Sequence, residues 1–150
     1  MRVLLDTHVL LWALAEPRRL DGETRSTIES GETEVLFSAA SIWEIAIKAG
    51  LGRGDFAFDP AEIARAALDT GFTELALRSN AAALVRRLPL LHRDPFERVL
   101  VAQAIVEPAT LYTADKQLVP YSDLVRRTCR SRRRVRACGL LLLAGRRTEG

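Results

Sequence analysis

The chain has 150 residues, of which 48% are hydrophobic and 27% are charged. This length and balance predict one soluble domain with its own core and argue against two domains. The sequence contains no run near the roughly 20 apolar residues that cross a bilayer, and its first residues lack the pattern of a basic segment, an apolar run and a small-residue cleavage site. We therefore expect a cytoplasmic protein. Two cysteines cannot build a disulfide framework and match no zinc-site spacing, so any bound metal must use oxygen ligands.

The net charge of +3 is distributed unevenly along the chain. Residues 1–122 contain 13 basic and 17 acidic side chains, a net charge of −4, whereas residues 123–150 contain nine arginines and two acidic residues, a net charge of +7. A basic chain is typical of proteins that bind nucleic acid. Here the basic charge belongs to the last segment and says little about the domain that precedes it.

Short apolar runs alternate with segments that have helix-capping residues and closing glycines. In chain order they predict a strand at 2–5, helices at 9–14 and 21–30, a strand at 34–37, helices at 39–49 and 60–69, a strand at 74–77, helices at 79–87 and 95–106, and strands at 110–113 and 124–128. This alternation predicts an α/β fold with a mostly parallel sheet covered by helices on both faces. Ligand sites of such sheets lie beyond the carboxyl ends of the strands, where Asp6 and Asp115 fall.

The segment 39–49 is apolar nearly all round, which predicts an interior helix. Its polar residues Ser41, Glu44 and Lys48 share one stripe. A buried carboxylate needs a partner, because an unpaired charge costs several kcal/mol to bury. Two interpretations of Glu44 remain open: an ordinary i,i+4 ion pair with Lys48, or a ligand for a cation.

Asp94-Pro95-Phe96-Glu97 has the pattern of a capping box, which the chain repeats at residues 59–62. Capping does not exclude a second use, because side chains at a helix start can also face an ion. Asp6 and Asp115 are open to a similar alternative, since turn-forming aspartates are common at strand ends. Several carboxylates gathered at one sheet edge would repel one another unless a divalent cation neutralised them. Oxygen ligands favour Mg²⁺ or Mn²⁺ over zinc, and such a site suits metal-assisted phosphodiester hydrolysis.

Four segments together resemble the motifs of PIN-domain ribonucleases, specifically the VapC toxins of bacterial toxin–antitoxin pairs. They are residues 1–8 (MRVLLDTH), 38–48 (SAASIWEIAIK), 92–98 (HRDPFER) with 101–104 (VAQA), and 113–115 (TAD). Each motif alone is weak, but all four occur in the family's order and spacing, and the resemblance covers about residues 1–122. It implies a three-layer α/β/α sandwich and a Mg²⁺-dependent endoribonuclease, with Mn²⁺ as an alternative. It also implies a homodimer and a cognate VapB-like antitoxin that inserts a segment into the acidic groove.

The resemblance transfers functional roles to matching positions. Asp6, Glu44, Asp94 and Asp115 match the acidic quartet and are the predicted catalytic residues and metal ligands. Glu97 stands where the family commonly has a second aspartate, so it is a further predicted ligand, and whether Asp94 or Glu97 lies closer to the metal stays open. Thr113 resembles the family's hydroxyl residue that orients water or a carboxylate, which makes it a further predicted catalytic residue, and Thr7 resembles a second flanking hydroxyl. Apart from the resemblance, the charge of Lys48, Arg93 and Arg98 predicts RNA contacts, with ordinary surface residues as the alternative. We expect His8 and His92 to pack or cap, with acid–base catalysis as the alternative for both and an RNA phosphate contact as a further one for His92.

The implied substrate is structured RNA, tRNA or rRNA, cut to leave 5′-phosphate and 3′-hydroxyl ends. One alternative is a catalytically impaired PIN-fold module that mainly binds an antitoxin or basic peptide. Another is a nuclease for DNA or a magnesium phosphatase on a related sheet.

Residues 129–150 form an atypical basic extension after the predicted domain 1–128. It contains Cys129, Cys138, an arginine-rich run and an apolar run at 140–143. Three interpretations compete: an RNA-binding arm, a docking or oligomerisation segment, and an accidental extension from a shifted reading frame. We favour the last, because arginine-rich sequence without lysine is typical of a GC-rich gene read out of frame.

Overall fold

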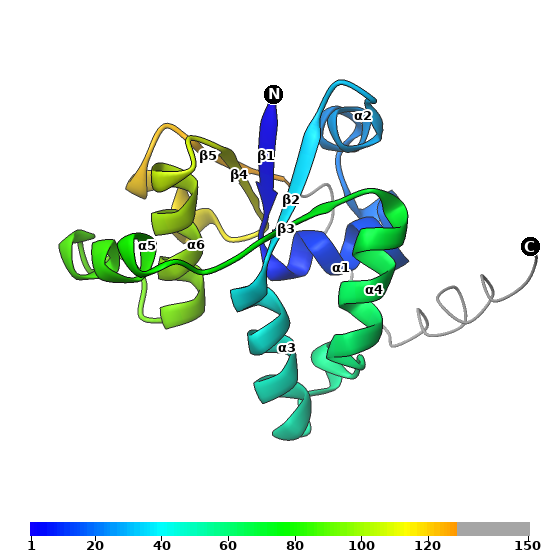
Figure 1. Cartoon of the computed structure of the whole chain (residues 1–150), viewed down its shortest axis with the longest axis horizontal. Helices are drawn as coiled ribbons and strands as arrows, with labels where there is room; N and C mark the ends of the chain where they lie inside the picture. The colour runs from blue at the N-terminus through cyan, green and yellow to red at the C-terminus, as the bar shows by residue number, and fades with distance from the viewer. Residues whose placement is uncertain (129–150) are drawn as a thin grey trace, which may run out of the picture.

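A computed structural model describes residues 1–128 as one five-stranded sheet flanked by helices (Figure 1). The strand order is β3-β2-β1-β4-β5, and every neighbouring pair is parallel. The strands are β1 (Arg2–Leu5), β2 (Glu34–Ser38), β3 (Thr73–Leu75), β4 (Thr110–Thr113) and β5 (Val125–Arg127). The extension at 129–150, with both cysteines, lies outside the described residues, and its three interpretations stay predictions.

The α-helices begin within two residues of their predicted starts. The α-helices are α1 (Thr7–Ala15), α2 (Gly22–Glu29), α3 (Ala39–Gly50), α4 (Pro60–Thr70), α5 (Ser79–Leu84) and α6 (Pro95–Val106), and the 3₁₀ turns are η1 (Pro17–Arg19), η2 (Gly54–Phe56), η3 (Val85–Arg87) and η4 (Lys116–Tyr121). All of the α-helices but α5 have a polar side chain that accepts a first free backbone N–H group. Asp59 caps α4, and Gly71 ends it with a φ of +96°, which a side-chain-bearing residue rarely adopts.

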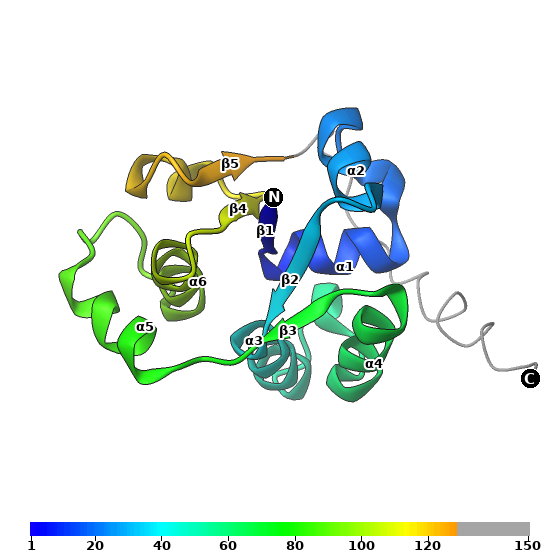
Figure 2. The ribbon, with the colours of Figure 1, turned by 45° about the horizontal axis from the view of Figure 1, so that its top comes forward.

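Alternate residues of the strands enter two separate apolar cores. Val3, Leu5 and Phe37 pack with α1, α3 and α4 on one face, while Leu4 and Leu111 pack with α6 and η4 on the other. Figures 1 and 2 show α1 and α4 on one side of the sheet and α5 and α6 on the other. The predicted three-layer α/β/α sandwich with a parallel sheet is therefore confirmed.

Helix α3 differs from the prediction of an interior helix. Trp43 is 58% exposed and Ile47 is 37% exposed, whereas Ser41 and Glu44 are buried. The helix packs against α1, α4 and α6 and turns its polar stripe inward. The prediction was wrong because an apolar composition cannot show which face meets the rest of the chain. Two element ends also differ from the predictions. The strand β3 ends at Leu75 and not at residue 77, and α5 ends at Leu84, where a 3₁₀ turn replaces the rest of the helix predicted to residue 87.

The topology brings distant segments to one point. From the central strand β1 the chain builds β2 and β3 on one side and then crosses to β4 and β5 on the other. The carboxyl ends of β1 and β4 are therefore neighbours at a switch point, where α/β sheets typically bind ligands. The Ser38 hydroxyl caps α3 and also donates to Gln103 Oε1 of α6 at 2.5 Å, which ties both helices to the same edge. Within residues 1–128, no helix is long and apolar enough to cross a membrane.

Candidate active site

Three aspartates at the carboxyl edge of the sheet use one oxygen to cap a helix and present the other to the site. The Oδ1 atoms of Asp6, Asp94 and Asp115 accept the backbone N–H groups of residues 9, 96 and 117 at 2.8, 2.9 and 2.8 Å. Their Oδ2 atoms contact other side chains of the site. Capping and site formation, which the sequence analysis treated as compatible for Asp94, occur together in all three aspartates.

Asp6 is the most firmly held of these carboxylates. It is 1% exposed, and its Oδ2 accepts hydrogen bonds from Thr113 Oγ1 at 2.5 Å and from the Ala114 N–H at 3.0 Å. Thr113 Oγ1 also accepts the Asp115 N–H at 3.0 Å, so one hydroxyl links two of the predicted ligands. Burial raises the pKa of Asp6, although the nearby His8 and these hydrogen bonds oppose the increase.

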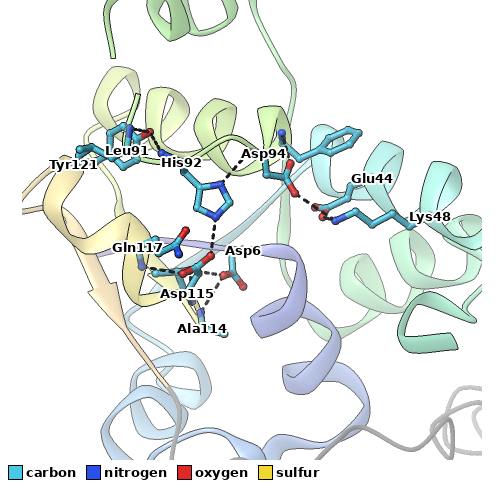
Figure 3. Close-up of polar contacts among 12 residues, drawn as sticks. Asp6, Glu44, Lys48, Leu91, His92, Asp94, Ala114, Asp115, Gln117 and Tyr121 are labelled. Carbon is cyan, nitrogen blue, oxygen red and sulfur yellow. Dashed lines mark hydrogen bonds and ion pairs between the residues drawn. The ribbon is translucent and has the colours of Figure 1, made fainter. Parts of the chain in front are cut away.

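Glu44 is fully buried and has two partners. Thr7 Oγ1 donates to its Oε2 at 2.5 Å, and the Lys48 ammonium pairs with its Oε1. Lys48 Nζ also lies 3.5 Å from Asp94 Oδ2, so it bridges α3 and the start of α6 (Figure 3). Burial lowers the pKa of Lys48, but its bonds and charge interactions with Glu44 and Asp94 outweigh that effect and raise it. The predicted i,i+4 ion pair thus exists inside the acidic site.

Glu97 is buried, and the other four carboxylates of the site all act on it electrostatically. It is 6% exposed, and its buried Oε2 has no hydrogen-bond partner among the described residues. Burial raises its pKa to about 9, and the charges of the other four carboxylates add to the shift: Asp6, Glu44, Asp94 and Asp115. The predicted capping box is only half formed, because the Asp94 N–H donates to His92 Nδ1 at 3.0 Å.

His92 connects the loops that carry Asp94 and Asp115. Its Nδ1 accepts the Asp94 N–H, so Nε2 carries the proton and donates to Asp115 Oδ2 at 2.8 Å. The Tyr121 hydroxyl accepts the N–H groups of Leu91 and His92 at 3.1 and 2.9 Å (Figure 3). The expected loop-capping role of His92 is confirmed. His8 packs edge-on against Phe56 with ring centroids 5.2 Å apart, which agrees with its expected packing role.

Four of the five carboxylates open onto a cavity of about 470 Å³, whereas Glu44 is buried behind Lys48 and does not line it. Its walls are Asp6, His8, Trp12, Lys48, Asp94, Glu97, Ala114, Asp115, Lys116 and Arg127. Sequence reasoning did not assign Lys116 or Arg127 to the site. The adjacency of Lys116 to Asp115 was an available signal, but the approach of β5 to the cavity depends on strand order.

The predicted RNA contacts have different surroundings. The Lys48 ammonium is directed at carboxylates. Arg98 Nη2 donates to the carbonyls of Val85 and Leu88, both at 3.0 Å, and Arg98 is not among the residues that line the cavity. Its guanidinium holds the segment between α5 and α6 through these two carbonyls, so the geometry does not support a substrate contact. Arg93 is exposed beside the Asp94 cap and remains a predicted contact.

The donor set suits a hard divalent cation, because four carboxylates line one cavity, a fifth, Glu44, is buried behind Lys48, and one buried carboxylate oxygen of Glu97 lacks a partner among the described residues. Within residues 1–128, however, no three His, Cys, Asp or Glu side chains converge closely enough to hold a metal in this conformation. Lys48 bridges Glu44 and Asp94, and His92 holds Asp115. Metal ligation by these residues therefore stays a prediction.

Comparison with known proteins agrees with the fold and the motifs. The PIN domain family model matches residues 3–123, and the chain belongs to this family as a VapC-type member. Ribonuclease VapC22 of Mycobacterium tuberculosis is 32% identical over 120 residues, covering 77% of this chain and 88% of the relative.

A structural relative has the same fold. A chain of the crystal structure of VapBC2 from Rickettsia felis, bound to a DNA fragment from their promoter, superposes with a TM-score of 0.60 at 13% identity, covering 85% of this chain and 99% of that one. The expected PIN-like fold is therefore confirmed.

Proposed function

We propose that this protein is a ribonuclease toxin of a toxin–antitoxin pair and that it hydrolyses RNA phosphodiester bonds with Mg²⁺, or Mn²⁺, in the acidic cavity. The observation that carries the proposal is the convergence of four carboxylates from three segments on one cavity at the sheet's switch point, with buried Glu44 joined to them through Lys48. The kinship with Ribonuclease VapC22 supports RNA as the substrate.

The chain's own residues would prepare the site for this reaction. Asp6, Glu44, Asp94, Glu97 and Asp115 are the proposed ligands. A divalent cation bound there would supply an activated water and neutralise charge on the phosphate. Thr113 orients Asp6 through its 2.5 Å hydrogen bond and fixes the Asp115 backbone, while Thr7 holds Glu44. These residues act by keeping carboxylate oxygens in place before the metal and substrate arrive.

The proposed partners follow from the relatives. A VapB-like antitoxin is the proposed inhibitor, since the structural relative is a VapBC2 complex. A homodimer is the proposed assembly, and exposed Trp43, Ile47 and Leu51 on and just after α3 offer an apolar surface for it. Light scattering on purified protein measures this assembly directly. The proposed RNA substrate is tRNA or rRNA.

The decisive experiment compares RNA cleavage by the wild type, Asp6→Asn and Asp59→Asn. Asp6 and Asp59 both cap helices through Oδ1, but only Asp6 lines the cavity. We expect wild type and Asp59→Asn to cut structured RNA with Mg²⁺ and to stop with a chelator, and Asp6→Asn to lose roughly a hundredfold or more of this activity.

Magnesium-dependent cleavage retained by folded Asp6→Asn would contradict the proposal. Growth arrest on expression alone, relieved by Asp6→Asn, separates the toxin from an inactive binding module. A parallel assay on DNA oligonucleotides separates RNA from DNA as the substrate.

A further inference from the structure

Lys48 is a cation placed inside the cluster of acidic side chains. Its side chain is 15% exposed, and its ammonium pairs with buried Glu44 on its own helix and with Asp94 at the start of α6. We propose that Lys48 is the internal counter-ion of the acidic cavity: it holds Glu44 and Asp94 in the metal-free protein and competes with a divalent cation for their oxygens. This inference rests on the proposed function for the identity of the competing cation.

The position of the ammonium is set from several sides. Besides the two carboxylates, the Phe56 ring lies 4.7 Å and the Phe96 ring 5.9 Å from Nζ, measured to the ring centroids. Aromatic faces attract cations, so these rings favour a charged lysine at this place. A solvated surface lysine would have neither the rings nor the buried partner. The geometry points to a group held at the cavity rather than one free to reach RNA phosphate.

Charge balance gives the reason for a counter-ion. Glu44 is fully buried, and burying an ionised carboxylate is costly unless it is paired and hydrogen-bonded. Thr7 supplies one hydrogen bond and Lys48 supplies the charge. Asp94, the second partner of the ammonium, lies at the start of α6, so one cation neutralises carboxylates of two helices. Because the Lys48 ammonium pairs with both Glu44 and Asp94, it bridges two of the predicted metal ligands.

The first test uses no metal. Thermal unfolding in chelator is compared for the wild type, Lys48→Met, Glu44→Gln and the double variant. We expect Lys48→Met to lower the melting temperature by roughly 5 °C, because it leaves Glu44 charged and buried. Adding Glu44→Gln to Lys48→Met should recover part of that loss, since it removes the unpaired charge. Strictly additive effects would contradict the counter-ion role, and the double variant keeps the test informative if Lys48→Met does not fold.

The second test measures Mn²⁺ affinity by calorimetry for the wild type, Lys48→Met, Lys48→Arg and Lys116→Met. Lys116 also lines the cavity, and no ion pair of its side chain is found in the described part of the chain, so Lys116→Met removes the same charge without freeing Glu44. We expect Lys48→Met to bind Mn²⁺ roughly tenfold more tightly than the wild type. Lys116→Met should change affinity much less, and Lys48→Arg should stay near the wild type.

The outcomes separate this inference from the proposed function. Equal or weaker Mn²⁺ affinity in Lys48→Met, or an equal gain in Lys116→Met, overturns the competition between Lys48 and metal. Cleavage of RNA by the wild type is scored independently. A wild type that cuts RNA while Lys48→Met shows no affinity gain refutes only the inference. An affinity gain in a protein that cuts no RNA refutes only the proposed ribonuclease activity.

Discussion

Replacing Glu97 with glutamine removes a carboxyl group that this fold keeps protonated at neutral pH. Burial and four neighbouring carboxylates raise the pKa of Glu97 from 4.5 to about 9. Between these pH values the folded protein holds a proton that the unfolded chain releases. The stabilising contribution is therefore fully present below about pH 4.5 and is lost as the pH rises towards 9.

The pKa difference sets the size of the effect. Each pH unit within this window lowers the free energy of unfolding by up to about 1.36 kcal/mol. From pH 6 to pH 8 the wild type should therefore lose up to about 2.7 kcal/mol through this group. Glutamine has no proton to lose, so the stability of Glu97→Gln relative to the wild type should grow with pH. Contributions from other titrating groups are shared by both proteins and largely cancel.

Urea unfolding in chelator at pH 6, 7 and 8 measures this difference. Glu62→Gln is the matched control, because Glu62 occupies the same position in the capping pattern of α4 and lies outside the cavity. We expect the control to follow the wild type across the pH range. Parallel curves for Glu97→Gln and the wild type would refute the reasoning. Mg²⁺ should shrink the difference if Glu97 is a ligand, since metal binding displaces the proton.

Three further predictions address a supporting hydroxyl and the two arginines that were predicted to contact RNA. Thr113→Val should lower the free energy of unfolding by about 1–3 kcal/mol and reduce RNA cleavage, because Asp6 Oδ2 and the Asp115 N–H lose a shared partner; Thr110→Val on the same strand is the control, and an equal effect there would contradict the specific role. Arg98→Met should cost about 1–2 kcal/mol of stability with no change in the salt dependence of RNA binding, because its guanidinium serves two carbonyls. Arg93→Met should leave the free energy of unfolding unchanged and reduce the slope of RNA affinity against salt concentration by about 1. The opposite pattern for the two variants in urea unfolding and RNA-binding assays would reject both assignments.

The fold was largely predictable because its signals are local. The apolar run at 2–5 ends at Asp6, and the aspartates before α4 and α6 mark helix starts, as the structure confirms. Alternating strands and helices predict parallel pairing, since a parallel connection needs a crossover. The weakest prediction concerned α3, whose apolar composition agreed with the burial of Glu44 but did not show that Trp43 faces outward.

The membership of the site was also readable from the sequence, through the acidic residues of the four motifs. The surroundings and the pKa values of these acidic residues could not be read from the sequence. Asp94 and Glu97 have the same pattern as Asp59 and Glu62, yet only the first pair lines the cavity that Asp6 and Asp115 also line. The difference arises because α6 begins beside the carboxyl end of β1, whereas α4 begins away from it. The raised pKa of Glu97 depends on charges from three other segments, which chain spacing does not report.

The sequence by itself therefore determined where strands and helices begin, which carboxylates follow them, and the family to which the chain belongs. Those properties depend on neighbouring residues, through capping, burial pattern and motif order. Only the tertiary structure decided that Lys48 lies among the carboxylates and that Arg98 closes a loop. Such properties depend on residues distant in the chain, because burial and Coulomb interactions act through space and are set by strand order and helix packing.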